Sequence, residues 1–343
     1  MSFRTSSQAL WILASCITAC GGSQPAPEPA GTPPAAIASA SSLPPAAVIT
    51  DKSPADPAPA PAKAEAPKAP PPPTPVLKYT GVFATPESVL YDAVGDRYLV
   101  SNINGTPFEK DNNGYITELS PDGKVVKDKF IAGGVGGVKL NAPKGSAIAQ
   151  GILYVADIDV VRKFEVKTGA PKGEIPVPGA LFLNDVSAAP DGKVYVVDSA
   201  IKAGAQGFEP AGGEAVYVIE KGKLKTLAKS AELSNPNGVL AWEKGALVNT
   251  MLKAELYRLD EKGARQDVTT LPGGGLDGLV AAGDTLLVSS WSASTIYRGK
   301  LGGTFEPVLV GLPGSADIGF DTKRQRVLVP RFLDSVVEVY ALP

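Results

Sequence analysis

Histidine is absent from this chain of 343 residues. Its absence excludes imidazole general bases, Ser-His-Asp triads and zinc sites with His ligands. The two cysteines, Cys16 and Cys20, both lie within the first twenty residues, so the rest of the chain can form neither a disulfide nor a cysteine metal cluster. Any bound metal must therefore be a hard cation with oxygen ligands, which means calcium, magnesium or manganese.

The chain also lacks an excess of positive charge, because its formal net charge is -2. A protein that binds phosphate backbones normally presents a basic surface. We therefore expect no nucleic acid among its partners.

The first apolar run, Ala9 to Ala14, is too short to span a bilayer, which needs roughly 20 apolar residues. It follows Arg4 and suits the hydrophobic region of a secretory signal. The segment Ile17-Thr18-Ala19-Cys20 then resembles a bacterial lipobox, and Leu13-Ala14-Ser15-Cys16 is the alternative. Cleavage before Cys16 would leave too short a hydrophobic region. We therefore expect a lipoprotein signal peptide over residues 1–19 and lipidation of Cys20.

Residues 20–75 consist largely of proline and alanine after the lipidated cysteine. Proline fixes φ and removes backbone donors, so this composition favours extended polyproline II and cannot build a core. We expect a disordered linker that holds the globular part away from a membrane. The predicted location is the cell envelope, with the protein exported and lipid-anchored to the outer membrane if the organism is Gram-negative.

From residue 76 onward, short β-branched and aromatic runs alternate with Gly, Asp-Gly, Asn-Gly and Pro-Gly, and no long helical period appears. A matching tripeptide precedes each of six such runs, at separations of about 40–57 residues. These six lead-ins are Glu87-Ser88-Val89, Lys144-Gly145-Ser146, Asn184-Asp185-Val186, Asn237-Gly238-Val239, Asp277-Gly278-Leu279 and Asp317-Ile318-Gly319. A repeat of this length with several strands is typical of a propeller blade. The two longer intervals indicate loop insertions near residues 105–113 and 202–213.

The predicted fold is therefore all-β. It is a six-bladed β-propeller over residues 76–343, built from four-stranded antiparallel blades. The last repeat ends after its third strand, near Tyr340. The unassigned run from Val76 to Phe83 can supply the fourth strand, which would close the ring and remove an exposed sheet edge.

In a propeller the inner strands begin at one end of the central channel, so the first lead-in residues should form a ring. All six are polar or charged, namely Glu87, Lys144, Asn184, Asn237, Asp277 and Asp317. Converging carboxylate and amide oxygens suit calcium, which takes 6–8 oxygen ligands. The alternative is that the Asn-Gly and Asp-Gly pairs are only turns, as Asp122-Gly123 and Asp191-Gly192 are expected to be.

The motifs Thr85-Pro86-Glu87-Ser88-Val89, Leu183-Asn184-Asp185-Val186, Pro236-Asn237-Gly238-Val239 and Leu276-Asp277-Gly278-Leu279 resemble those of the SMP-30/gluconolactonase/LRE-like family, in the same order. The resemblance implies a six-bladed propeller and metal-dependent hydrolysis of lactones or esters. It implies metal ligation by Glu87, Asn237 and Asp277, and substrate contact by Asn184 and Asp185. The implied cofactor is a divalent cation, with calcium favoured over magnesium and manganese.

Within this scheme Asp277 is the natural proton acceptor and hence the expected catalytic residue. Lys144 departs from the ligand pattern. Its ammonium either pairs with Glu87 or Asp277 and replaces the metal, or it holds a substrate carboxylate or an oxyanion, or it points away. Asp317 is expected to be structural. Trp242 and Trp291 are expected to pack between sheets.

Two functions follow as expectations. The first is a divalent-cation-dependent lactone or ester hydrolase displayed on the cell envelope, monomeric and held to the membrane by its lipid. The second is a non-catalytic propeller of the NHL type that binds a protein or glycan of the envelope. The fold alone does not decide between them.

Overall fold

The computed structural model describes residues 73–205 and 207–342. The predicted signal peptide, Cys16, Cys20 and most of the proline-rich linker lie outside the described residues. Within the described part of the chain, no helix has the length and apolar character needed to cross a membrane.

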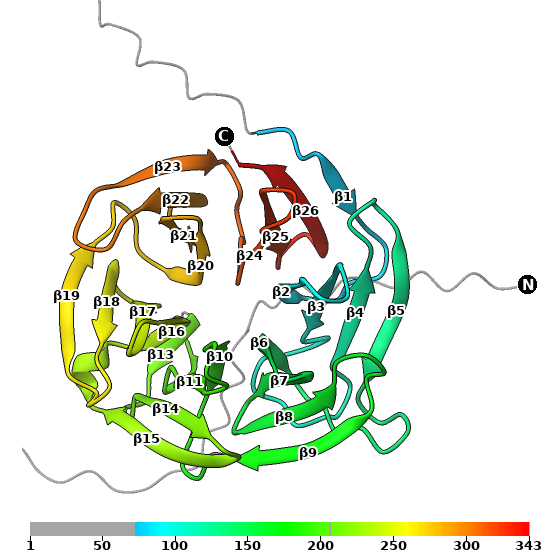
Figure 1. Cartoon of the computed structure of the whole chain (residues 1–343), viewed down its shortest axis with the longest axis horizontal. Helices are drawn as coiled ribbons and strands as arrows, with labels where there is room; N and C mark the ends of the chain where they lie inside the picture. Colours follow the sequence, from blue (N-terminus) through cyan, green and yellow to red (C-terminus); the bar gives the residue numbers. More distant parts are fainter. Residues whose placement is uncertain (1–72, 206, 343) are drawn as a thin grey trace, which may run out of the picture. The chain divides into compact units, whose positions relative to one another are not determined.

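In the described residues, six four-stranded antiparallel sheets surround a common centre, as Figure 1 shows. Each sheet is one blade, numbered here in chain order, and the strands nearest the centre are β2, β6, β10, β16, β20 and β24. The strands of blades 1 to 3 are β2 Pro86–Asp92, β3 Arg97–Asn102, β4 Tyr115–Leu119, β5 Val125–Ala132, β6 Pro143–Ala149, β7 Ile152–Asp157, β8 Val160–Glu165, β9 Pro171–Pro176, β10 Leu183–Ala188, β11 Val194–Asp198, β14 Ala215–Glu220 and β15 Lys223–Lys229. Those of blades 4 to 6 are β16 Pro236–Trp242, β17 Gly245–Thr250, β18 Glu255–Leu259, β19 Arg265–Thr270, β20 Leu276–Ala282, β21 Thr285–Ser290, β22 Thr295–Gly299, β23 Phe305–Val310, β24 Gly319–Asp321, β25 Arg326–Arg331 and β26 Val336–Ala341.

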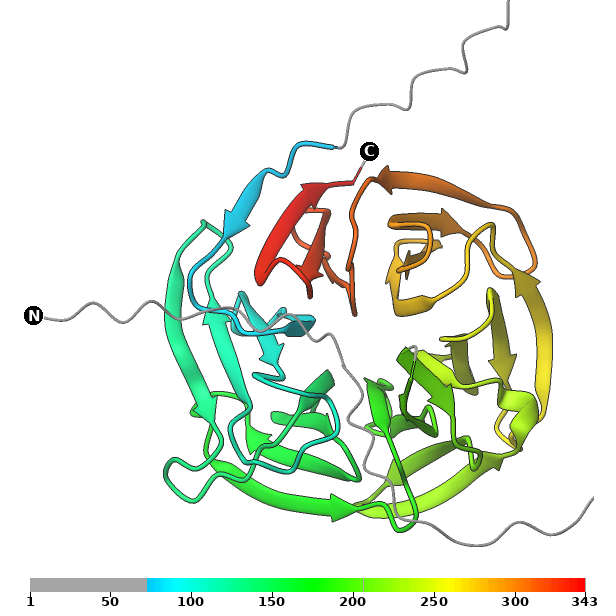
Figure 2. The same cartoon turned by 180° about the vertical axis from the view of Figure 1, so that it is seen from behind.

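The sixth blade is completed by the start of the propeller. Strand β1, Leu77–Tyr79, pairs antiparallel with β26, and Leu77 lies opposite Val339. In the view from behind in Figure 2, the first described strand lies beside the last one. The predicted closure by an N-terminal strand is confirmed, and pairing both chain ends in one sheet leaves this blade with its full set of strands.

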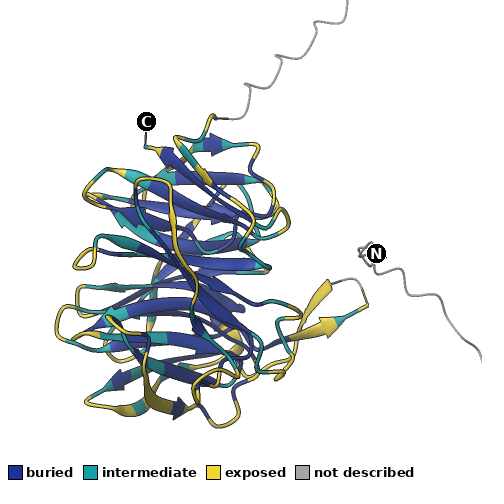
Figure 3. Ribbon diagram, turned by 90° about the vertical axis from the view of Figure 1, so that its right-hand side faces the viewer, coloured by how far each residue is buried: buried dark blue, intermediate teal, exposed yellow. Residues whose placement is uncertain are grey.

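Burial follows the order of strands within a blade. Middle strands such as β3 and β4 are almost wholly buried, whereas the outer strand β5 is mostly exposed. Figure 3 shows the same gradient as dark blue strands inside and yellow segments at the periphery. Hydrophobic clusters lie between adjacent blades, for example where Leu99 of blade 1 packs with Leu153 and Phe164 of blade 2. Blade-to-blade packing therefore supplies the core, and the polar outer turns face solvent.

Both predicted insertions exist, and one contains regular structure. The first forms the connection between β3 and β4 in blade 1. The second contains a hairpin of β12 Ile201–Gly204 and β13 Gly207–Pro210, which pairs with itself and joins no blade. In Figure 3 this hairpin is the exposed pair of strands that projects from one face of the ring. A 3-10 helix, η1 Ala231–Leu233, follows β15.

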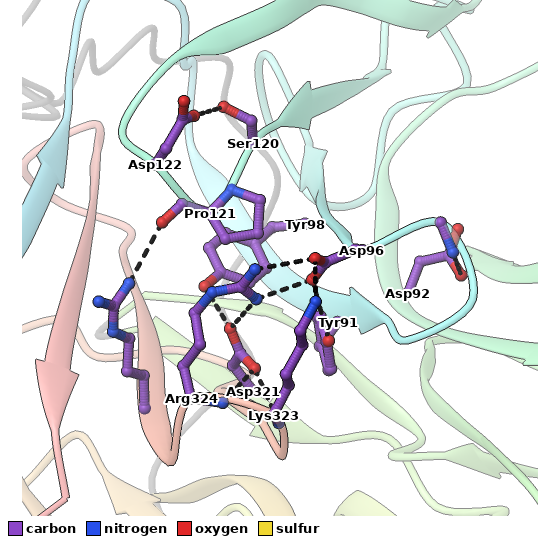
Figure 4. Close-up of polar contacts among 12 residues, drawn as sticks. Tyr91, Asp92, Asp96, Tyr98, Ser120, Pro121, Asp122, Asp321, Lys323 and Arg324 are labelled. Atoms are coloured by element: carbon purple, nitrogen blue, oxygen red, sulfur yellow. Dashed lines mark hydrogen bonds and ion pairs between the residues drawn. The ribbon is translucent and has the colours of Figure 1, made fainter.

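A polar latch joins blade 6 to blade 1 where the ring closes (Figure 4). The carboxylate of Asp321, which is fully buried, accepts hydrogen bonds from the Tyr98 hydroxyl at 2.7 Å and from Arg324 at 3.0 Å. Arg324 also pairs with Asp96 in the turn between β2 and β3, at 2.7 Å. Because a buried carboxylate needs partners, Tyr98 and Arg324 offset the cost of burying Asp321 while they fasten the two blades together.

Candidate functional site

Five of the six lead-in residues line one cavity of about 230 Å³, which we call the hub pocket. They are Glu87, Lys144, Asn184, Asn237 and Asp277, and each is at most 6 % exposed. They come from the first residues of β2, β6, β10, β16 and β20. The repeat in the sequence therefore identified side chains that converge in space.

A β-bulge at the start of each of these five inner strands aims the side chains into the pocket. The pairing register shifts between Pro236 and Val239 and, in the same way, between Leu276 and Leu279. The other three strands show the same irregularity at the equivalent place. An extra residue in a bulge bends the strand and redirects a side chain, which is why bulges are frequent beside functional sites.

The glycines that follow Asn237 and Asp277 have a packing role. Neither residue pair lies in a turn, since Gly238 and Gly278 fall inside β16 and β20. A Cβ on Gly238 would lie 2.2 Å from the Asp277 carbonyl oxygen, and one on Gly278 would lie 2.2 Å from the Ile318 nitrogen. The turn interpretation is thus wrong at these positions, although it holds at Gly123 and Gly192, which have positive φ. Glycine is required at the hub because neighbouring inner strands approach closely.

Polar residues at the ends of the second strands hold the segments that lead into the pocket. Asp198 at the end of β11 accepts hydrogen bonds from the backbone N–H groups of Leu181 and Phe182, at 3.1 and 2.9 Å. Asp157 at the end of β7 likewise accepts from the N–H of Ala142 at 2.9 Å. These bonds fix the backbone just before Asn184 and Lys144.

Asp317 is one residue out of phase with the other lead-ins. In blade 6 Ser315 pairs with Arg331, at the place where Leu276 pairs with Ser290 in blade 5. The residue that follows Ser315 is Ala316, and it therefore occupies the position that Asp277 has in blade 5. The predicted six-residue ring is therefore wrong at this blade. Asp317 instead lines a separate cavity of about 550 Å³ along the inner strands, and it accepts a hydrogen bond from Ser88 at 2.5 Å.

Asp185 also lines that second cavity, away from the hub pocket that its neighbour Asn184 lines. Its carboxylate accepts from the backbone N–H groups of Val186 at 2.7 Å and Val239 at 2.8 Å. Asp185 thus joins blade 3 to blade 4. The structure does not bring it together with the other candidate substrate-binding residues.

Four buried carboxyl groups lie around the hub, those of Glu87, Asp185, Asp277 and Asp317. Burial is the largest cause that raises the pKa of Asp277, to about 8, and the nearby Asp317 raises it further. Burial likewise raises the pKa of Asp317 to about 7, and burial with neighbouring carboxylates raises the pKa of Glu87 and of Asp185. Buried carboxyl groups that raise one another's pKa cannot all ionise cheaply without a compensating positive charge.

Lys144 is fully buried and does not form a salt bridge with Glu87 or Asp277, which was one of the three alternatives left open by the sequence. Its Nζ donates to the carbonyl oxygens of Ala142 at 3.2 Å and Pro107 at 3.3 Å, and it lies 4.2 Å from the centre of the Phe182 ring. Burial lowers its pKa to about 8. The Lys144 side chain also lines the hub pocket, so its positive charge acts on a ligand bound there.

Two oxygens of the predicted ligand set have no hydrogen-bond partner. Glu87 Oε2 and Asn237 Oδ1 are buried and unpaired, whereas such atoms are normally satisfied. Asp277, the third member, lines the same pocket. Among residues 73–205 and 207–342, no group of three Asp, Glu, Cys or His side chains could hold a metal ion. The predicted ligand set therefore needs the amide oxygen of Asn237 as its third ligand. Two carboxylates and an amide oxygen fit a hard divalent cation.

Trp291 lines the hub pocket, so the prediction that it packs between sheets is wrong. Its indole Nε1 donates to Asp277 Oδ2 at 2.6 Å, and its ring lies 5.3 Å from that of Phe332, which also lines the pocket. Its place directly after β21 is the signal that could have found it, because the ends of second strands face the pocket. Trp242 packs against the core of blades 4 and 5, as expected.

No protein-family model matches the chain. No curated protein matches it either.

Among solved structures, the chain is similar to a gluconolactonase from Xanthomonas campestris, with a TM-score of 0.56, 18% identity and coverage of 78% of this chain and 89% of that one. It is similar to a luciferin-regenerating enzyme, with a TM-score of 0.57, 16% identity and coverage of 78% and 95%. A virginiamycin B lyase from Staphylococcus aureus gives a TM-score of 0.52, 14% identity and coverage of 77% and 98%. The protein is thus a six-bladed β-propeller whose structural neighbours include gluconolactonase-like propellers.

Proposed function

We propose that the protein is a divalent-cation-dependent hydrolase of lactones or esters, with calcium as the favoured cation. The observation that carries the proposal is the pair of unpaired buried oxygens, Glu87 Oε2 and Asn237 Oδ1, beside Asp277 in one pocket. The gluconolactonase among the structural neighbours supports the choice of reaction. The lyase among them has the same fold, so the fold by itself does not select the chemistry.

Glu87, Asn237 and Asp277 would hold the cation. When bound, it would supply Lewis-acid polarisation of the ester carbonyl and would favour ionisation of water. The carboxylate of Asp277 is oriented by the Trp291 indole and can take the proton of the attacking water. Water oxygen then bonds to the carbonyl carbon, the ester C–O bond breaks, and the proton passes to the departing alkoxide.

Lys144 supplies the complementary positive charge. One of its N–H groups is not engaged by the Ala142 and Pro107 carbonyls, and the side chain lines the pocket. An ammonium at this position can stabilise negative charge on the carbonyl oxygen as the tetrahedral intermediate forms. Asn184, held by its hydrogen bond to Ser199 at 3.1 Å, lies at the same wall and is proposed to contact the substrate.

The proposal predicts that calcium or manganese raises the melting temperature of the metal-free protein. Binding at one hundred times the dissociation constant should add about 2.7 kcal/mol to the free energy of unfolding. The measurement is a thermal melt after chelation, with each cation added back, together with a screen of lactone and ester hydrolysis. A melting temperature that no divalent cation changes, with no hydrolysis, would favour the non-catalytic binding function.

We also propose that the mature protein is anchored to the cell envelope through a lipid on Cys20. The proposal rests on the lipobox pattern and on the length of the apolar run before it. Labelling with radioactive palmitate should mark the native chain and the control Cys16→Ser, and both should sediment with membranes. Cys20→Ser should lose the label and the membrane fraction. Retention of both by Cys20→Ser would show that Cys20 is not the anchor.

A further inference from the structure

The hub pocket has one polar end, and the rest of its wall is apolar. The polar end consists of the five lead-in side chains. The apolar wall includes Ile103, Phe182, Phe208, Met251, Trp291 and Phe332. At about 230 Å³ the cavity is smaller than most pockets for drug-sized molecules. Its occupant must therefore be compact and must turn an apolar surface toward most of the wall.

The two insertions meet to build part of this wall. Phe108 comes from the connection between β3 and β4, and Phe208 comes from β13 in the projecting hairpin. Their ring centres lie 5.9 Å apart, and Phe182, which precedes β10, lies 5.0 Å from Phe108 and 6.1 Å from Phe208. Three mutually packed rings form an apolar surface at the pocket.

Phe208 remains 44 % exposed although it is large and apolar. It lines the pocket from a hairpin that makes no strand pairing with any blade. An apolar side chain held on an exposed hairpin at the edge of a pocket indicates contact with an apolar ligand.

The hydrogen-bonding groups of the pocket lie together at its polar end. They include the unpaired oxygens Glu87 Oε2 and Asn237 Oδ1, which are proposed to hold the cation, and the side chains of Lys144, Asn184 and Asp277. The Trp291 indole N–H is already bonded to Asp277, and the Asn237 amide N–H to the Leu276 carbonyl at 2.9 Å. A ligand with hydroxyls along its whole length would bury several of them against rings and aliphatic chains, where they would lose their bonds to water.

We propose that the substrate is a lactone or ester with a short alkyl or aryl substituent, and that polyhydroxylated sugar lactones are poor substrates. The carbonyl faces Glu87, Asn237, Asp277 and Lys144, and the substituent lies against Phe182, Phe208 and Trp291. This inference rests on the proposed function, because it specifies the substrate of the same site.

A matched series of six-membered lactones tests the proposal on the full chain saturated with calcium. δ-Valerolactone has no substituent, δ-nonalactone has a butyl chain, and glucono-δ-lactone carries hydroxyls. Because each methylene in an apolar pocket contributes roughly 10-fold or more, kcat/KM for δ-nonalactone should exceed that for δ-valerolactone by at least about 10-fold. Glucono-δ-lactone should be the slowest. If it matches or exceeds δ-nonalactone, the inference is wrong.

Phe208→Ser should remove most of the advantage of δ-nonalactone, so that the ratio of its kcat/KM to that of δ-valerolactone falls toward one. Phe208 lies on an exposed hairpin outside the blades, so the variant should fold. The control is Val126→Ser on the outer strand β5, where the side chain is 51 % exposed and does not line the pocket. It should keep the native preference. An unchanged preference in Phe208→Ser would exclude contact between Phe208 and the substituent.

If the protein hydrolyses none of the three lactones, the proposed function is wrong. The order of their binding affinities then tests the inference separately. Isothermal titration of the intact protein with the same three compounds should give the order δ-nonalactone, δ-valerolactone, glucono-δ-lactone from tightest to weakest. Equal or tighter binding of glucono-δ-lactone would reject an apolar substituent as the determinant.

Discussion

Asp277→Asn is expected to lower kcat/KM for lactone hydrolysis by about 10²–10⁴-fold, the range typical for loss of a general base. The substitution keeps the size of the side chain and removes its charge. Asparagine can still accept a hydrogen bond from Trp291, but it cannot take a proton from water. The same variant should lose most of the calcium-dependent rise in melting temperature, because one of two carboxylate ligands is gone.

Asp321→Asn is the matched control. Asp321 is equally buried, but it belongs to the latch between blades 6 and 1, where it bonds Tyr98 and Arg324. We expect it to lower the melting temperature in the presence and absence of calcium alike, with kcat/KM nearly unchanged. If Asp277→Asn behaved like Asp321→Asn, with lower stability and native activity, Asp277 would be a structural residue.

The melting temperature of the metal-free protein is expected to fall as the pH rises from about 5 to about 8. The pKa of Asp277 is raised to about 8 and that of Asp317 to about 7, from an ordinary value of 3.8. Between these values the folded chain holds protons that the unfolded chain has released, so the free energy of unfolding falls with pH. The raised pKa of Asp277 corresponds to a loss on the order of 5 kcal/mol.

Calcium should suppress this loss. The cation competes with protons for Glu87 and Asp277, so its stabilising effect should be small at pH 5 and largest near pH 8. Thermal melts in chelator and in excess calcium, at half-unit steps of pH, provide the measurement. Above pH 8 the lowered pKa of Lys144 acts in the opposite direction, because the unfolded chain there binds a proton that the folded chain has released. A metal-free melting temperature that is flat from pH 5 to 8 would contradict the buried carboxylate cluster.

Much of the fold could be predicted because its signals are local and repeat. Alternating apolar residues and Asp-Gly turns mark each strand and its end. Six repeats then leave few ways to bury the apolar faces of the sheets except blade against blade. The completion of blade 6 by Leu77–Tyr79 could be predicted from a missing strand at one end of the chain and a spare one at the other.

The composition of the site was predictable only in part. Five lead-in residues converge because each occupies the same position at the start of an inner strand. Asp317 broke the pattern, since the one-residue offset of its blade depends on strand pairing that the sequence spacing does not reveal. Trp291 was missed because a tryptophan after a strand also fits ordinary packing between sheets.

The sequence by itself determined the six repeats, the closure and the polar character of the hub, since each depends on residue type at a fixed spacing. Only the tertiary structure decided what those hub residues contact. The loop near Phe108 and the hairpin of Phe208 lie far apart in the chain, yet they pack beside Phe182. Lys144 bonds two backbone carbonyls and leaves Glu87 Oε2 unpaired. Such contacts follow from how the blades are placed relative to one another, and no local pattern in the sequence encodes that placement.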